Sequence, residues 1–107
     1  MKDYYIDIAI KEAEKSTMSR GKHGACVVLR GKVIAVGHNR KFINGPDKRR
    51  VLSLHAEMDA MRKCSPKDLR KAQLYVVRKN FGNSKPCKAC QKAINRFGIT
   101  KIFYSEK

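Results

Sequence analysis

Two short motifs in this chain carry residues that can do metal chemistry. One is a His-x-Glu triplet at His55 and Glu57, and the other is a Cys-x-x-Cys pair, Cys87 and Cys90, preceded by Pro86. A catalytic zinc site takes three protein ligands and keeps a fourth position open for water, and zinc accepts both imidazole nitrogen and thiolate sulfur. We therefore predict that His55, Cys87 and Cys90 bind Zn²⁺.

Glu57 supplies the proton chemistry that such a site needs. Two thiolates leave the metal site formally neutral, so a nearby base must take the proton from the activated water. Glu57 is two residues from His55 and suits that role, passing the proton to a ring nitrogen and then to departing ammonia. The combination of H-x-E with P-C-x-x-C is typical of zinc-dependent nucleobase deaminases, so it predicts hydrolytic deamination. We expect the neighbouring Asp59 to be structural.

Each motif alone also allows other interpretations. A C-x-x-C pair can be a redox pair or half of a structural zinc site, which would need a fourth Cys or His. Cys26 lies inside an apolar, strand-like run and is expected to be a small core residue, and Cys64 lies near a predicted helix end as an ordinary thiol. The order and spacing of the two motifs together favour catalytic zinc.

Hydrophobic periodicity and turn residues predict alternating helices and strands with one long loop. In chain order these are a helix at 3–15, a loop at 16–24, strands at 25–29 and 33–36 joined by a tight hairpin turn, a long loop at 37–54, a helix from about 53 or 55 to 63, a strand at 74–77, a helix at 87–97 and a strand at 99–104. Gly98 is expected to end the last helix, and a long ordered loop is usually functional.

This order of elements predicts an α/β fold with a mixed sheet. The hairpin should be antiparallel, and the later strand-helix-strand unit should be a right-handed parallel crossover with helices covering the sheet. Both motif-bearing helices then begin near one region of the sheet, which brings His55, Glu57, Cys87 and Cys90 together. No repeat or linker divides the chain, so residues 1–107 are predicted to form a single domain.

Composition restricts the partners and the compartment. The formal net charge is +16, spread over both halves of the 107 residues, so a polyanionic partner or an anionic substrate is expected. No segment is apolar for long enough to span a membrane, and the amino terminus lacks a secretory signal, so no membrane partner is predicted. Four cysteines, two of them assigned to metal, fit a reducing compartment and predict a cytoplasmic location.

From about Gly24 to Tyr104 the chain resembles the cytidine and deoxycytidylate deaminase superfamily, through the two motifs above. The resemblance implies a three-layer α/β/α sandwich, a zinc ion held by His55, Cys87 and Cys90, and Glu57 as the proton shuttle. It also implies that Asn39, in the run Gly-His-Asn, contacts the sugar of the substrate. The alternative for Asn39 is an ordinary turn asparagine beside a glycine.

Within the superfamily the chain is most similar to the deoxycytidylate-type branch, in the segments 55–60 and 98–104. Lys85 stands where transfer-RNA adenosine deaminases usually have Glu, and Lys88 stands where free cytidine deaminases usually have Gly. The chain ends at Lys107, directly after the last predicted strand, where relatives usually add further elements. That shortened end implies a homo-oligomer in which a neighbouring subunit completes the pocket.

The expected function is zinc-dependent hydrolytic deamination of cytosine to uracil in a nucleotide such as dCMP. Basic loop residues are candidates for binding its phosphate: Arg20, Lys22, Lys48, Arg49 and Arg50. One alternative is a deaminase of cytosine or adenine in single-stranded RNA or DNA, including transfer RNA, with Phe42 or Phe81 stacking on a base. Another is a non-catalytic nucleic-acid-binding protein that keeps zinc for stability, although such a protein has no use for Glu57.

Overall fold

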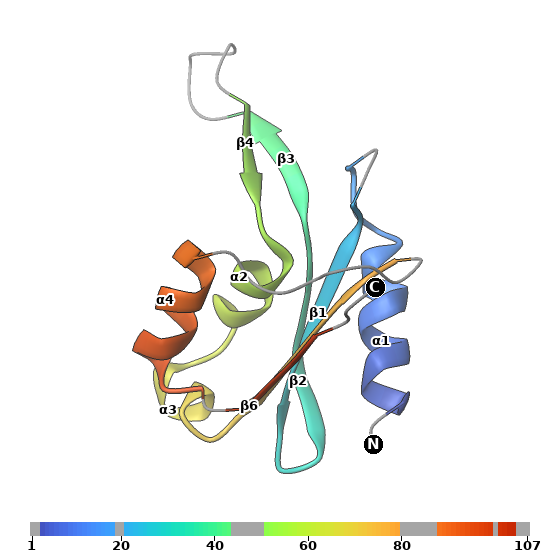
Figure 1. The fold of residues 1–107 in the computed structure, drawn as a ribbon. Coiled ribbons are helices and arrows are strands. Elements are labelled where there is room, and N and C mark those ends of the chain that lie inside the picture. Colours follow the sequence, from blue (N-terminus) through green and yellow to red (C-terminus); the bar gives the residue numbers. More distant parts are fainter. Residues whose placement is uncertain (1–2, 19–20, 44–50, 80–87, 100, 105–107) are drawn as a thin grey trace.

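A four-stranded mixed sheet forms the middle layer of the molecule (Figure 1). The structure is a computed structural model and describes residues 3–18, 21–43, 51–79, 88–99 and 101–104. The strands lie in the order β2 (Lys32–His38), β1 (His23–Leu29), β5 (Gln73–Arg78) and β6 (Lys101–Tyr104). β1 pairs antiparallel with β2 and β5, whereas β5 and β6 are parallel. The predicted antiparallel hairpin and the later parallel pair are therefore confirmed.

Both faces of the sheet are apolar, because side chains alternate along its central strands. In β1, Ala25 and Val27 belong to one hydrophobic cluster, whereas Cys26 and Val28 belong to a second cluster on the opposite face. β5 alternates in the same way. A sheet that is apolar on both faces must be covered on both sides. The expectation that Cys26 is a core residue is confirmed.

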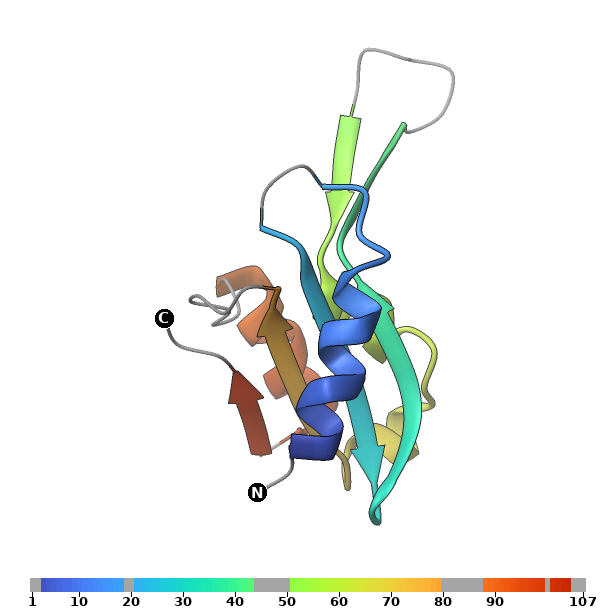
Figure 2. The ribbon, with the colours of Figure 1, turned by 90° about the vertical axis from the view of Figure 1, so that its right-hand side faces the viewer.

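Helices cover the two faces. α1 (Asp3–Ala13) packs on one face through the cluster that contains Cys26. α2 (Ala56–Met61), α3 (Pro66–Leu69) and α4 (Lys88–Phe97) lie together on the other face (Figures 1 and 2). The predicted three-layer α/β/α sandwich is confirmed. Within the described residues, no helix combines the length and apolarity needed to cross a bilayer.

The long loop predicted at 37–54 is wrong in part. β3 (Arg40–Ile43) and β4 (Val51–Leu54) pair antiparallel and form a separate two-stranded ribbon beyond the main sheet (Figure 1). Each strand has only four residues, and the first begins with two charged side chains, so neither gives a clear alternating pattern. β4 leads directly to His55, which precedes α2.

The segment after α2 also differs from the prediction. No element was predicted between the helix that ends at 63 and the strand at 74–77, but Pro66 opens the short helix α3 there. The Ser65 hydroxyl caps that helix by accepting a hydrogen bond from the Asp68 amide at 3.2 Å. A serine cap followed by proline in the first helical position is a favourable start for a helix.

Two glycines allow α1 and α2 to lie close to the sheet. A Cβ atom on Gly24 would overlap the backbone of Ala9 in α1, and a Cβ atom on Gly37 would overlap the backbone of Ala60 in α2. Gly24 and Gly37 are on neighbouring strands, where Gly24 pairs with His38 and Gly37 pairs with Ala25. Both helices therefore approach the sheet closely near this end.

Replacing Gly37 by alanine should lower the free energy of unfolding by about 3 kcal/mol, because backbone atoms of α2 would have to move away. Gly31→Ala is the matched control. Its Cβ would meet nothing closer than the Tyr5 hydroxyl at 3.8 Å, so only the left-handed backbone costs energy, about 1 kcal/mol. Urea unfolding measures both values, and equal losses would contradict the close approach of α2.

Candidate metal and catalytic site

His55, Glu57 and Cys90 come together on the α2 and α4 side of the sheet. One ligand atom from each lies within 4.8 Å of the others, and His55 Nδ1 is 3.1 Å from Cys90 Sγ. Glu57 and Cys90 are buried, whereas His55 is exposed. The predicted convergence of these three residues is therefore present, and the cluster is accessible from the side of His55.

The start of α2 positions both His55 and Glu57. His55 is the N-cap residue, with an extended backbone, and its carbonyl accepts the first helical hydrogen bond from the Asp59 amide at 2.9 Å. Glu57 then falls in the first turn. Ala56 and Ala60 are fully buried, so the side of the helix that carries these two small residues packs against the core. The packing of the alanines thus fixes the depth of Glu57.

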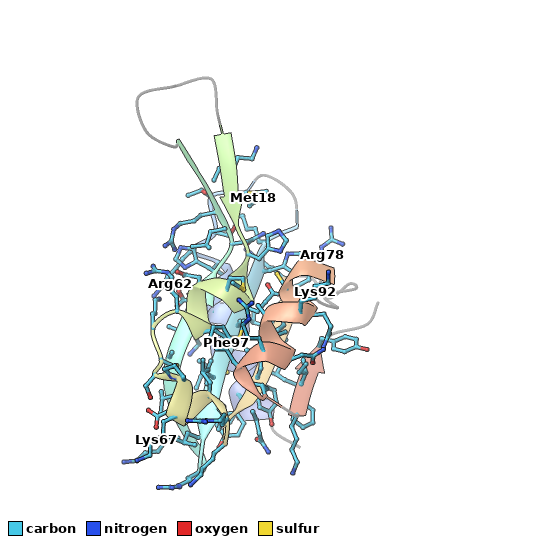
Figure 3. All side chains as sticks on the ribbon, turned by 90° about the vertical axis from the view of Figure 1, so that its left-hand side faces the viewer. Met18, Arg62, Lys67, Arg78, Lys92 and Phe97 are labelled. Atoms are coloured by element: carbon cyan, nitrogen blue, oxygen red, sulfur yellow. The ribbon has the colours of Figure 1, made fainter. Side chains whose placement is uncertain are left out.

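Cys90 comes from the inner side of α4. Cys90 and Ile94 are one helical turn apart and both are buried, whereas Lys92 and Arg96 are exposed. Figure 3 shows Lys92 on the outside of α4 and Phe97 between α4 and the neighbouring helices. Cys87, the third predicted ligand, lies outside the described residues.

The two other cysteines do not join the cluster. Cys26 belongs to the core on the opposite face, and burial raises the pKa of its thiol to about 12. The sheet separates this thiol from the cluster on the α2 and α4 side. Cys64 directs its sulfur to the Ala60 carbonyl at 3.7 Å. Neither residue provides the extra ligand that a structural zinc site would need.

Asp59 lies two residues after Glu57 and is fully buried. It receives a bidentate pair of hydrogen bonds from Arg40, each 3.1 Å long, and a bond of 2.9 Å from Arg62 Nε. Its Oδ2 also accepts a bond from the backbone amide of His38, at 3.2 Å. Asp59 therefore joins α2 to the end of β2 and the start of β3. Its predicted structural role is confirmed by these contacts.

Charge and hydrogen bonding keep this buried carboxylate ionised. Burial by itself would raise the pKa of Asp59, but the hydrogen bonds from His38, Arg40 and Arg62 and the charge of Lys63 outweigh it. The pKa of Asp59 therefore lies below its ordinary value. A carboxylate held in this way stabilises the fold only while it is charged.

Asn39 lies between β2 and β3 and is held by the chain itself. Its Oδ1 accepts the backbone N–H of His23, and its Nδ2 donates to the Gly21 carbonyl, both at 2.8 Å. The preceding residue, His38, contacts Asp59 near the start of α2. Asn39 is thus fixed at the end of the sheet near which α2 begins.

The other predicted substrate residues are mostly outside the described part of the chain. These are Arg20, Lys48, Arg49, Arg50 and Phe81. The side chain of Phe42 is also outside it. Lys22 is described and half-buried, immediately before β1.

The Arg40–Asp59 pair could not be predicted from the amino-acid sequence. Arg40 and Asp59 are nineteen positions apart in the sequence, and no recognisable motif contains both. A buried acidic residue requires a cationic partner, but no local pattern in the sequence marks Asp59 as buried.

A comparison with known protein families also indicates a zinc-binding site. Residues 1–106 match the sequence profile described as the cytidine and deoxycytidylate deaminase zinc-binding region. This chain belongs to that deaminase family. Its class of enzyme and its zinc cofactor, both predicted from the motifs, are thereby confirmed.

Relatives of this deaminase include proteins of the deoxycytidylate type. The deoxycytidylate deaminase of Mycobacterium phage D29 is 29% identical over 126 residues, covering 98% of this chain and 94% of that protein. The human deoxycytidylate deaminase is 26% identical over 121 residues, and this chain spans 65% of its length. The apo crystal structure of dCMP deaminase from cyanophage S-TIM5 has a TM-score of 0.70 at 26% identity, covering 96% of this chain and 80% of that one.

The described donors of this deaminase fit the zinc ion of its family. Two donors on one tetrahedral zinc lie about 3.5 Å apart, given bonds of about 2.0 Å to nitrogen and about 2.3 Å to sulfur. The distance of 3.1 Å between His55 Nδ1 and Cys90 Sγ is close to that value. An imidazole nitrogen and a cysteine sulfur are also donor types that zinc accepts, and the Glu57 carboxylate lies beside them.

Replacing Asp59 by asparagine should destabilise the protein by about 2 kcal/mol at neutral pH, because the partly exposed guanidinium groups of Arg40 and Arg62 lose the buried counter-charge to which they bond. The pKa of Asp59 is lowered by folding, so its contribution is full above the unfolded pKa and is lost as pH falls through the folded pKa. The difference between wild type and variant should therefore shrink below about pH 4.

Urea unfolding of both proteins at neutral and acidic pH measures this difference. Asp68→Asn is the control, since Asp68 lies near the surface in α3 and its replacement should cost less than about 1 kcal/mol. A loss for Asp59→Asn that does not change with pH would show that the carboxylate charge does not matter.

Proposed function

We propose that this chain catalyses the zinc-dependent hydrolytic deamination of cytosine to uracil in a nucleotide, with deoxycytidylate as the substrate. The observation that carries the proposal is the convergence of His55, Glu57 and Cys90 in a member of this deaminase family. The phage and human relatives, both named deoxycytidylate deaminases, support the choice of substrate. The net charge of +16 suits an anionic substrate.

The residues divide into metal ligands and an acid/base. His55 and Cys90, with Cys87, would hold the zinc ion, which when bound activates a water molecule for attack on C4 of the base. Glu57 takes a proton from that water and delivers it to N3 of the ring. It then takes the second proton from the hydroxyl group now bonded to C4 and delivers it to the amine nitrogen as the C4–N4 bond breaks, so cytosine and water give uracil and ammonia.

The burial of Glu57 suits this sequence of proton transfers. Its side chain is almost fully buried, so few bulk water molecules compete for the proton. It also comes from the same helical turn as the ligand His55, which keeps the carboxylate close to the metal position. A carboxylate that serves a purely structural metal site needs no such placement.

Asn39 is the proposed contact to the sugar. Its Oδ1 accepts one hydrogen bond from His23, and an amide oxygen has two acceptor sites. The second can accept a hydrogen bond from a sugar hydroxyl group. The fixed position of Asn39, held by Gly21 and His23, would orient the nucleotide without further cost in side-chain entropy.

We also propose a cytoplasmic location and a homo-oligomeric assembly. The free thiols of Cys26 and Cys64 suit a reducing compartment. Assembly is supported by Phe103 on the edge strand β6, which is 39% exposed and stacks on Tyr75. The buried Tyr75 hydroxyl has no hydrogen-bond partner within the described residues. A second subunit packed on this edge would cover the aromatic ring and supply a partner.

Ammonia release from deoxycytidylate, cytidylate, cytidine, adenylate and a cytosine-containing oligonucleotide tests the proposed function. Turnover should be fastest with deoxycytidylate. Glu57→Gln should keep zinc and lose about 10²- to 10⁴-fold in kcat, because the proton shuttle is removed. Cys90→Ser should lose zinc, measured by metal analysis after dialysis.

Cys64→Ser is the matched control, and it should keep both zinc and activity because Cys64 lies outside the cluster. Zinc retention by Cys90→Ser would contradict the ligand assignment. Turnover on the oligonucleotide alone would replace the nucleotide proposal by the polymer alternative.

Asn39→Ala should raise KM for deoxycytidylate about tenfold, since one hydrogen bond to the sugar is worth about 1 kcal/mol or more. The same variant should have a much smaller effect on a substrate that lacks the sugar hydroxyl groups. Steady-state kinetics on the two substrates separates a sugar contact from a structural role. An equal rise in KM for both would assign Asn39 to structure only.

A further inference from the structure

The basic residues of this protein are distributed unequally between its two helical layers. The α2, α3 and α4 layer exposes a continuous set of cations, here called the basic face: Arg62, Lys63, Lys67, Arg70, Lys71, Lys92 and Arg96. Among the described residues 62–71 and 90–97, Asp68 is the only acidic one. Figure 3 looks onto this layer and shows Arg62, Lys67 and Lys92 spread across its three helices.

The α1 layer is electrically balanced. Its exposed charges are Asp7, Lys11, Glu14 and Lys15, and Lys15 forms an ion pair of 3.1 Å with Glu12. A chain that carried lysine and arginine only for solubility would show the same excess on both layers. Between the two helical layers, the excess of exposed positive charge therefore lies on the α2, α3 and α4 layer.

We propose that the basic face binds the phosphate backbone of nucleic acid. Cations spread over several helices match a row of phosphates, and release of counterions from the polymer supplies the affinity. The proposal goes beyond the deamination of a nucleotide, because this surface lies outside the metal cluster and needs no cytosine.

The chemistry of the face favours nucleic acid over a membrane surface. Helices that lie on a bilayer bury large apolar side chains beside their basic ones. The large hydrophobic residues exposed in the described part of the chain are Tyr4, Ile34 and Phe103, and none belongs to α2, α3 or α4. The face therefore offers charge without an apolar anchor.

The basic face is connected to the catalytic cluster through α4. Cys90 and Ile94 are on the buried side of this helix, and Lys92 and Arg96 are on its exposed side. A strand held on the face would therefore pass over the helix that carries a proposed metal ligand.

Fluorescence anisotropy with labelled oligothymidylate and the zinc-loaded protein tests the proposal. This oligonucleotide has no amino group on its bases, so neither turnover nor failure of the proposed deamination affects the result. With about five phosphate contacts, Kd should rise about a hundredfold between about 50 and 200 mM salt. No binding by the wild-type protein at low salt would overturn the proposal.

The decisive variant reverses four exposed charges of the basic face: Lys67→Glu, Lys71→Glu, Lys92→Glu and Arg96→Glu. Arg62 and Lys63 are left unchanged because both reach Asp59. Oligothymidylate binding should weaken at least about thirtyfold, and the slope of log Kd against log salt should fall by about 0.7 for each contact removed. A corresponding set of glutamine substitutions, with circular dichroism on each protein, excludes unfolding as the cause.

The matched control reverses four exposed charges elsewhere: Lys11→Glu, Arg30→Glu, Lys32→Glu and Lys41→Glu. It changes the net charge equally, but its charges lie outside the face, so Kd should change less than about threefold at about 0.15 M salt. An equal loss in both variants would overturn the assignment to this face. Tighter binding to phosphatidylserine vesicles than to the oligonucleotide, lost in the basic-face variant, would also overturn it.

Discussion

The Asp59 carboxylate is the interaction on which the arrangement of the site depends. It lies on α2 beside Glu57, and through Arg40 it holds the first residue of β3. β3 pairs with β4, and β4 leads to His55. One buried charge therefore links the helix that carries the proposed acid/base to the ribbon that delivers the proposed metal ligand. A lone buried carboxylate would cost several kcal/mol, so its cationic partners are required for the fold.

The same end of the sheet also joins the two helical layers. The backbone amide of His38 reaches Asp59 on the α2 side, while its Nδ1 lies 2.7 Å from Glu12 Oε2 on α1. Gly24 and Gly37, on the neighbouring strands, leave room for the two helices to approach. Small side chains and a shared histidine thus bring α1, the sheet and α2 into contact where the cluster forms. Movement of either helix there would be transmitted to Glu57 through the first turn of α2.

The sequence allowed the layers and most of the cluster to be predicted because both follow from local patterns. The continuous apolar run at 25–29 identifies a strand buried on both faces, and the H-x-E motif placed His55 and Glu57 at a helix start. The β3–β4 ribbon was missed because a four-residue strand such as 40–43 contains too little alternation. The Arg40–Asp59 pair was missed because a tertiary ion pair leaves no periodic trace in the sequence. In a similar way, the total charge was known from composition, but the excess of exposed cations on one helical layer over the other depends on how the helices pack.

The excess of exposed cations on the α2, α3 and α4 layer affects how anions reach the site. The field of a basic face acts over about 10 Å at moderate salt and raises the local concentration of nucleotides and polynucleotides alike. Attraction of this kind does not select a substrate, because it depends on phosphate alone. Selection requires short contacts at the base and the sugar, and in this fold the candidates for those contacts are Glu57 and Asn39, held by hydrogen bonds and packing that are independent of the surface charge. Binding on the basic face and chemistry at the cluster can therefore change separately, although α4 contributes residues to both.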